Sequence, residues 1–159
     1  MKRLIMIRRI VYVTLVIVIA ISCHNNQLEE KDLNPNLIIR TGTVCGWCTV
    51  NDTLTIHGNA VRYVNYTKCD NSKPFVEKTG QLPTSELEAL INKLDIGELK
   101  KIDLNSCNVC ADGCDDWIFF DNGLQSHYIR FGKGDPKLQS VQLFIDQLNA
   151  IKIQYSKVD

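Results

Sequence analysis

Short stretches of the chain alternate between apolar and polar side chains, which is the pattern of strands in an antiparallel sheet. Leu54 and Ile56 alternate with threonines, Gly58-Asn59 interrupts the pattern, and Val61 and Tyr63 resume it. An interruption by two turn-forming residues predicts a β-hairpin. Further strands are expected over 37–40, over 74–79, and over 117–120 and 124–131, where the intervening Asp121-Asn122-Gly123 favours a tight two-residue turn.

A helix is expected next, over 82–94. Its apolar residues recur at helical spacing and form one stripe: Leu87, Leu90, Ile91 and Leu94. Ser85 and Glu88 stand at the spacing of a capping box, which predicts that Ser85 caps the helix. Asp95 and Gly97 are poor helix formers, so the helix should end there and a short turn should follow.

A second helix is expected after Asp135-Pro136, because aspartate is a favoured N-cap and proline a favoured first helical residue. Apolar residues follow at helical spacing: Leu138, Val141, Phe144, Ile145, Leu148 and Ile151. Two hairpins with one helix after each predict an α+β domain over 37–159. We expect a small antiparallel sheet of two hairpins, two helices packed on one face of it, and cysteine clusters that staple the fold.

The first 23 residues have the layout of an export signal. Four basic residues precede or flank the start of an apolar run from Ile10 to Ile21, and Ser22 precedes Cys23. The run is shorter than the roughly 20 residues that a membrane-spanning helix needs. Its end, Ala20-Ile21-Ser22-Cys23, resembles the lipobox of bacterial lipoproteins, which implies a signal peptide over 1–22 and a lipid on Cys23. The alternative is an uncleaved N-terminal membrane anchor.

Polar and charged residues over 23–36, with one proline, predict a flexible tether. The charge run Glu29-Glu30-Lys31-Asp32 resembles the acidic signals of surface lipoproteins of Bacteroidota, with a solvated spacer as the alternative. Beyond residue 22 the chain holds 14 Lys and Arg against 18 Asp and Glu, a net charge of −4, which indicates no nucleic-acid partner. The sequence thus predicts export to the bacterial cell envelope, with the lipid on Cys23 holding the protein to the outer membrane.

Six cysteines lie beyond Cys23: Cys45, Cys48, Cys69, Cys107, Cys110 and Cys114. In an exported protein an even set of thiols predicts three disulfides, although sequence leaves fifteen connectivities open. Spacing separates two clusters, one at 45–48 and one at 107–114, with Cys69 between them. We expect the two clusters to meet in space, for example through a bond between Cys48 and Cys110.

Two alternatives for these cysteines stay open beside the disulfides. Four thiolates from two C-x-x-C pairs could hold a structural zinc ion. Cys45-Gly46-Trp47-Cys48 also invites comparison with thioredoxin-like redox sites, in which Cys45 and Cys48 would exchange with other thiols. Such a site needs its first cysteine at the start of a helix, whereas residues 49–56 alternate like a strand.

The functional hypothesis is a recognition edge beside the cysteine clusters. Trp47 and Trp117 flank the clusters, and Asp112, Asp115 and Asp116 form an acidic turn. Rigid loops lose little entropy on binding, so we expect a non-enzymatic domain that binds or stabilises an envelope protein. The aspartates could instead offer oxygens to calcium, or simply be solvated, and the tryptophans could pack over the disulfides as core.

Motifs that would indicate catalysis are missing from the sequence. There is no H-E-x-x-H, no G-x-S-x-G and no glycine-rich phosphate loop. Catalysis needs a nucleophile with a positioned base, or an acid and a base with separated pKa values. We therefore assign no catalytic residue and no cofactor.

The first part of the domain resembles a family of uncharacterised Bacteroidota lipoproteins. The resemblance rests on Leu37-Ile38-Ile39-Arg40, Cys45-Gly46-Trp47-Cys48, the Leu54-Thr55-Ile56 strand and the helix over 82–94. In that family a strand leads into a C-x-G-x-C-P-type motif, a hairpin and a helix. This chain lacks the proline after the second cysteine and has its own segment over 107–117. The resemblance implies an envelope location and an α+β fold, and it implies no catalytic residue.

Overall fold

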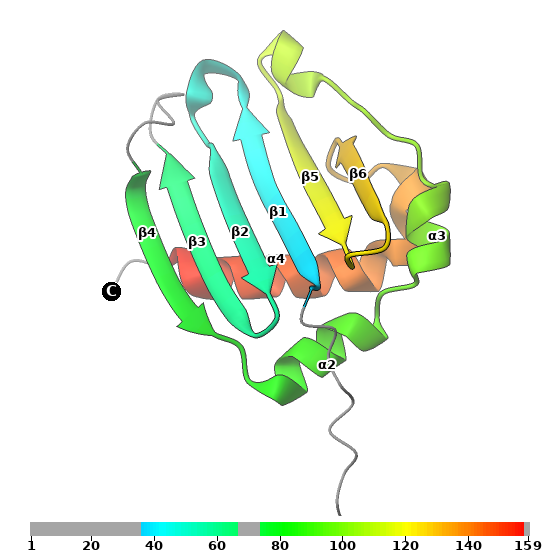
Figure 1. Ribbon diagram of the computed structural model, residues 1–159. Helices are drawn as coiled ribbons and strands as arrows, with labels where there is room; N and C mark the ends of the chain where they lie inside the picture. The colour runs from blue at the N-terminus through cyan, green and yellow to red at the C-terminus, as the bar shows by residue number, and fades with distance from the viewer. Residues whose placement is uncertain (1–35, 67–73, 158–159) are drawn as a thin grey trace, which may run out of the picture. The chain divides into compact units, whose positions relative to one another are not determined.

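Six strands form one antiparallel sheet in the computed structural model, which describes residues 36–66 and 74–157. The strand order is β4-β3-β2-β1-β5-β6, so the first strand lies in the middle (Figure 1). The strands are β1 (Ile38–Cys45), β2 (Asp52–His57), β3 (Ala60–Tyr66), β4 (Pro74–Gln81), β5 (Cys114–Asp121) and β6 (Ser126–Phe131). The helices are α2 (Thr84–Asn92), α3 (Ile96–Lys101) and α4 (Gln142–Ser156), with 3₁₀ turns η1 (Gly46–Cys48), η2 (Asn108–Ala111) and η3 (Pro136–Val141).

The hairpin of β2 and β3 has the turn that the sequence predicts. His57 pairs with Ala60, so Gly58-Asn59 is the two-residue connection. Gly58 has a φ of 56°, a conformation that costs glycine little because it has no Cβ. Leu54 and Ile56 point to the buried side of the sheet, as their alternation indicates.

The second hairpin has a longer loop than predicted. Asp121 pairs with Ser126, so four residues connect β5 to β6, and the prediction of a two-residue turn was wrong. The side-chain oxygen of Asn122 accepts hydrogen bonds from the backbone N–H groups of Leu124 and Gln125 at 3.1 and 3.0 Å. This side chain closes the loop, which removes the need for a tight Asn-Gly turn.

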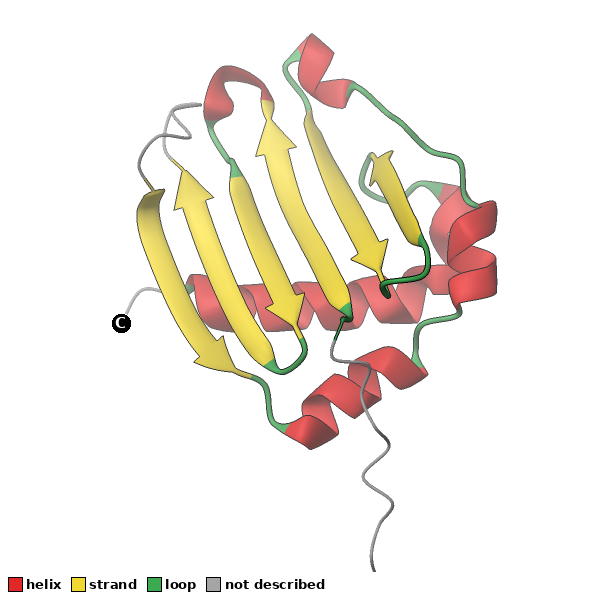
Figure 2. Cartoon of the chain, in the orientation of Figure 1, coloured by secondary structure: helices red, strands yellow, loops and turns green. Residues whose placement is uncertain are grey.

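Helix α4 lies against one face of the sheet, as predicted, and runs across the strands behind it, with α2 below the strand ends and α3 on the β6 side in this view (Figure 1 and Figure 2). All six apolar residues of the predicted C-terminal stripe are buried, on η3 and on α4: Leu138, Val141, Phe144, Ile145, Leu148 and Ile151. The side chain of Asp135 accepts a hydrogen bond from the N–H of Lys137 at 2.9 Å, and Pro136 begins the turn. The α+β prediction, with its N-cap, is confirmed.

The first helix begins differently from the prediction. Pro83 is the residue before α2, and its carbonyl oxygen accepts from the N–H groups of Glu86 and Leu87 at 2.9 and 3.1 Å. Ser85 is therefore inside the helix, and no side chain caps it, so the capping box was wrong. α2 ends at Asn92, before Asp95, close to the end that the sequence predicts. A second helix follows where a turn was expected, and the side chain of Asp95 caps this helix, α3, by accepting from the N–H of Glu98 at 3.0 Å.

Candidate functional site

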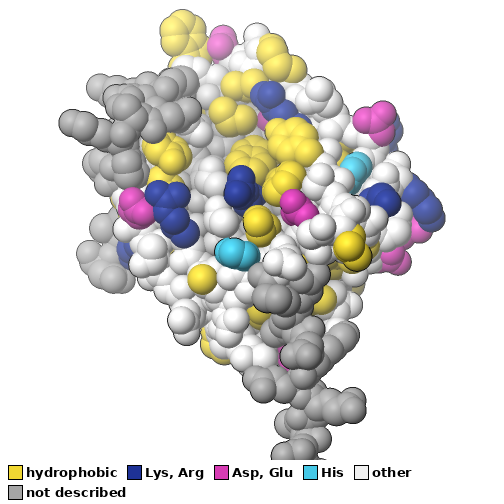
Figure 3. All heavy atoms as spheres, viewed as in Figure 1, with side chains coloured by type: hydrophobic (Ala, Val, Ile, Leu, Met, Phe, Trp, Pro, Cys, Tyr) yellow, Lys and Arg dark blue, Asp and Glu magenta, His cyan; other side chains and the backbone are white. Residues whose placement is uncertain are grey.

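The sheet face opposite α4 carries a cluster of aromatic side chains with a guanidinium beside them. Figure 3 views this face and shows hydrophobic side chains gathered near its centre with basic side chains next to them. Strand pairing places Arg40 of β1 opposite Phe119 of β5, and Phe119 opposite Tyr128 of β6, so all three lie on one face. Trp117 lies two residues before Phe119 on the same face. We call these four residues the aromatic face.

The side chains of the aromatic face contact one another across the strands. The rings of Trp117 and Tyr128 have centroids 6.2 Å apart and are tilted by 30°, within the range of favourable aromatic pairs. The guanidinium carbon of Arg40 lies 5.6 Å from the centroid of the Phe119 ring, close enough for a cation–π interaction. Tyr128 is 49% exposed. The face therefore offers ring surface and one positive charge to solvent.

Gly42 allows the Trp117 ring to lie against the backbone of β1. A Cβ atom at this position would stand 2.8 Å from the ring atoms Cε2 and Cζ2 of Trp117 and 2.1 Å from the carbonyl oxygen of Asp52. No side chain larger than hydrogen fits at that distance. Gly42 lies beyond the strand expected over 37–40, because β1 extends to Cys45. A glycine within a strand is a known signal of close approach.

The two cysteine clusters meet at one end of the sheet, as predicted. Cys45, the last residue of β1, pairs with Cys114, the first residue of β5, and a disulfide joins them with Cα atoms 4.0 Å apart. The N–H of Gly46 donates to the carbonyl oxygen of Gly113 at 2.8 Å. A second disulfide joins Cys107 to Cys110. The bond suggested between Cys48 and Cys110 was therefore wrong.

The observed disulfides limit the other cysteine hypotheses. Cys45 is bonded to Cys114 rather than to Cys48, and the 3₁₀ turn η1 follows it in place of an α-helix. Cys45, Cys107 and Cys110 are oxidised, so they are not thiolates that could hold zinc. Cys69 and the side chain of Cys48 lie outside the described residues.

Asp115 is buried in a hydrogen-bonded cage that the sequence does not reveal. Its side chain accepts from the Ser106 hydroxyl at 2.7 Å, from the backbone N–H groups of Asn108 and Val109 at 3.1 Å each, and from Arg130 at 3.0 Å. Burial alone raises the pKa of this carboxyl, but the hydrogen bonds from these partners lower it to about 2. Asp115 is therefore ionised at neutral pH and fixes η2 to the sheet.

The five residues of the expected recognition edge do not form one surface. Trp47 is 83% exposed, with φ at 54°, so it does not pack as core. Trp117 belongs to the aromatic face. Asp112 is exposed, whereas Asp115 is inaccessible. Asp116 accepts from the Thr43 hydroxyl at 2.5 Å, and this hydroxyl also accepts from Lys152 of α4, so Asp116 lies on the helix side.

The three aspartates consequently do not converge on a cation. Neighbouring residues of β5 point to opposite faces of the sheet, so Asp115 and Asp116 are separated by the strand itself. Within residues 36–66 and 74–157, no group of three or more His, Cys, Asp or Glu side chains is placed to hold a metal ion.

A buried ion pair between the sheet and α4 is a further feature that the sequence analysis missed. The Lys152 ammonium lies 3.3 Å from Asp52, whose other oxygen accepts from the Tyr63 hydroxyl at 3.4 Å. Burial first, and then the negative charge of Asp52, raise the pKa of Tyr63 to about 12. A signal existed, because Lys152 stands four residues after Leu148 on the apolar stripe. The cluster ties α4 to β1, β2 and β3.

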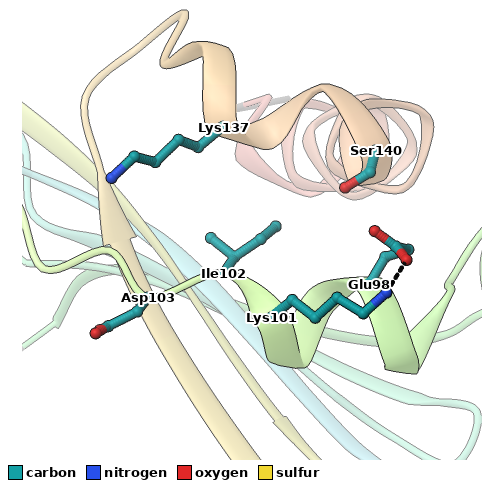
Figure 4. Close-up of a pocket in the computed structure, with 6 residues that line it drawn as sticks. All are labelled: Glu98, Lys101, Ile102, Asp103, Lys137 and Ser140. Atoms are coloured by element: carbon teal, nitrogen blue, oxygen red, sulfur yellow. Dashed lines mark hydrogen bonds and ion pairs between the residues drawn. The ribbon is translucent and has the colours of Figure 1, made fainter.

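A depression between α3 and η3 is a weaker candidate for a binding site. Its lining residues are Glu98, Lys101, Ile102, Asp103, Lys137 and Ser140. Figure 4 shows that Glu98 and Lys101 pair with each other along α3, and that the Lys137 ammonium and the Asp103 carboxylate extend away from Ser140. No set of polar groups converges there, so the aromatic face is the stronger candidate site.

No protein-family model matches the chain, and no curated protein matches it. In the part of the chain that the structure describes, no helix has the length and apolar content to cross a membrane.

Proposed function

We propose that this chain is an exported lipoprotein, held to the bacterial cell envelope by a lipid on Cys23, whose domain binds an envelope protein through the aromatic face. The signal layout over 1–23 supports export and lipidation. Two disulfides among the described residues of a chain of this size support residence in an oxidising compartment. The binding role is non-enzymatic and rests on a separate observation.

The observation that carries the binding role is the ring cluster on a sheet face without a helix over its centre. Aromatic side chains bury a large area on binding and lose little conformational entropy. In the described residues, no carboxylate pairs with the Arg40 guanidinium, which lies over Phe119 instead. Such a face complements a protein surface that presents a carboxylate among apolar side chains. This surface replaces the recognition edge as the binding site.

The lipid is tested by metabolic labelling with a fatty acid. We expect the wild-type protein to incorporate the label and Cys23→Ala to incorporate none, because the thiol of Cys23 is the acceptor. Cys110→Ala is the matched control and should label like wild type. Equal labelling of Cys23→Ala would show that the protein is not a lipoprotein anchored at this residue.

The binding face is tested by photo-crosslinking in living cells. A photoreactive amino acid at position 128 should give one dominant protein adduct, whereas the same group at Leu143, which is 70% exposed on α4, should not. Arg40→Glu in the position-128 protein should reduce the adduct at least tenfold, because two like charges facing each other cost binding energy. Arg40 is exposed, so we expect this variant to fold normally.

Two results would contradict the proposed binding face. One is the same adduct from positions 128 and 143. The other is an adduct at position 128 that Arg40→Glu leaves unchanged while the thermal unfolding temperature is also unchanged. Either result would place the contact elsewhere on the domain.

A further inference from the structure

The two disulfides among the described residues differ in how exposed their cysteines are. Cys107 and Cys110 are both exposed, whereas in the other bond Cys114 is exposed and Cys45 is only 4% exposed. A thiolate that attacks a disulfide expels the other sulfur as a thiolate. Attack on Cys114 would expel a buried and poorly solvated Cys45 thiolate. Attack on either sulfur of the Cys107–Cys110 bond expels a solvated one, so this second bond is the more exchangeable.

The disulfides also differ in how much chain they constrain. Cys45 and Cys114 are 69 residues apart in sequence, whereas Cys107 and Cys110 are 3 apart. The entropy that a disulfide removes from the unfolded chain grows with the length of the loop it closes. The long loop therefore gives the Cys45–Cys114 bond a structural role that the short loop does not give to Cys107–Cys110.

The turn between Cys107 and Cys110 is held in place without its disulfide. The N–H of Cys110 donates to the carbonyl oxygen of Cys107 at 3.1 Å. The N–H of Gly113 donates to the carbonyl oxygen of Asn108 at 2.8 Å. Asp115 accepts from the N–H groups of Asn108 and Val109, the two residues between the cysteines, at 3.1 Å each. Opening the disulfide leaves these bonds intact, so both thiols stay close enough to close again.

We propose that Cys107 and Cys110 form a redox-active pair that exchanges with an exported dithiol or disulfide protein, while Cys45–Cys114 stays closed. A thiolate of the dithiol partner attacks one sulfur of the pair, the Cys107–Cys110 bond breaks, and a mixed disulfide forms with release of a thiolate. The partner's second thiolate attacks the partner's own sulfur in the mixed disulfide, the bond to this chain breaks, and its cysteine leaves as a thiolate. The partner leaves as a disulfide, and two electrons and two protons have passed to Cys107 and Cys110. The reverse sequence oxidises a partner dithiol.

The pair is tested first by graded reduction of the lipidated protein in detergent. Free thiols are blocked with N-ethylmaleimide, dithiothreitol is added at increasing concentration, and the new thiols are labelled with isotopic N-ethylmaleimide and located by peptide mass spectrometry. We expect Cys107 and Cys110 to become labelled at a dithiothreitol concentration at least tenfold lower than Cys45 and Cys114. The near-ultraviolet circular dichroism of the folded domain should persist at that lower concentration.

The exchange activity is tested with a disulfide-linked peptide that fluoresces on cleavage, with dithiothreitol as the electron donor. Wild type should accelerate cleavage at least tenfold over the Cys107→Ser/Cys110→Ser variant. Leu143→Ala should match wild type, because Leu143 is 70% exposed on α4 and belongs to neither the disulfide nor the aromatic face. Reduction of both disulfides at one dithiothreitol concentration, loss of the folded spectrum together with Cys107–Cys110, or equal cleavage by wild type and the double variant would each overturn the proposal.

Discussion

Asp115→Ala is expected to lower the free energy of unfolding by about 3 to 5 kcal/mol, the range for removal of one partner from a buried ion pair. The carboxylate is inaccessible to solvent and bonded to Arg130, to the Ser106 hydroxyl and to two backbone N–H groups. Its removal leaves these partly buried donors without their acceptor. Urea denaturation at pH 7 measures the loss. Asp112→Asn is the matched control on the same segment. Asp112 is exposed and has a φ of 61°, which asparagine tolerates, so its effect should stay within about 0.5 kcal/mol.

The same carboxyl makes stability depend on acid pH. Its pKa is about 2 in the folded protein, against an ordinary value of 3.8. Because the folded pKa is the lower one, the contribution is complete above about pH 5 and is lost as pH falls toward 2. The difference corresponds to roughly 2 kcal/mol. We expect wild type to lose this amount over that range relative to Asp115→Asn, and identical acid profiles would show that Asp115 is not the group responsible.

The second large effect is expected from the Cys45–Cys114 disulfide. The bond closes a loop between residues 69 apart, and the chain-entropy relation assigns about 4 kcal/mol to such a loop. It also joins Cys45, the last residue of β1, to Cys114, the first residue of β5, at one end of the pairing between these two neighbouring strands. Cys45→Ala/Cys114→Ala should therefore lose about 4 kcal/mol in urea denaturation without reductant.

The matched control is Cys107→Ala/Cys110→Ala, which removes a disulfide between residues only 3 apart in sequence. The same relation assigns about 2 kcal/mol to a loop of that length. The control should thus lose about half as much stability as the first double variant. Equal losses in the two variants, or a larger loss in the control, would contradict the structural role of Cys45–Cys114.

The elements that could be predicted from sequence depend on neighbours a few residues away. The hairpin around Gly58-Asn59 follows from alternation and turn chemistry, and the α4 region follows from Asp135-Pro136 and an apolar stripe. The wrong predictions concern the start of a helix and the length of a loop, where two local hydrogen-bonding arrangements fit the sequence about equally well. The first N–H groups of α2 donate to the carbonyl oxygen of Pro83, so Ser85 does not cap the helix. The side chain of Asn122 closes a four-residue loop, where the sequence was equally compatible with a two-residue turn.

The roles of the aspartates were decided only by tertiary structure. Asp112, Asp115 and Asp116 look alike in sequence, yet one is exposed, one is caged and one faces the helices. Strand alternation sends adjacent side chains to opposite faces, and what covers each face comes from distant segments. The disulfide partner of Cys45 is also decided by tertiary structure, because the register of β1 against β5 places Cys114 beside Cys45.

The aromatic face is the clearest case of a feature that tertiary structure decides and the sequence does not. β5 is apolar on both of its sides, with Ile118 and Phe120 on one and Trp117 and Phe119 on the other. Alternation in the sequence indicates a strand but gives no reason to choose which side the helices cover. In the folded chain Ile118 and Phe120 are buried against the helix layer, and Trp117 and Phe119 stay partly accessible. That choice depends on how α4, which follows β5 by more than 20 residues, packs against the whole sheet.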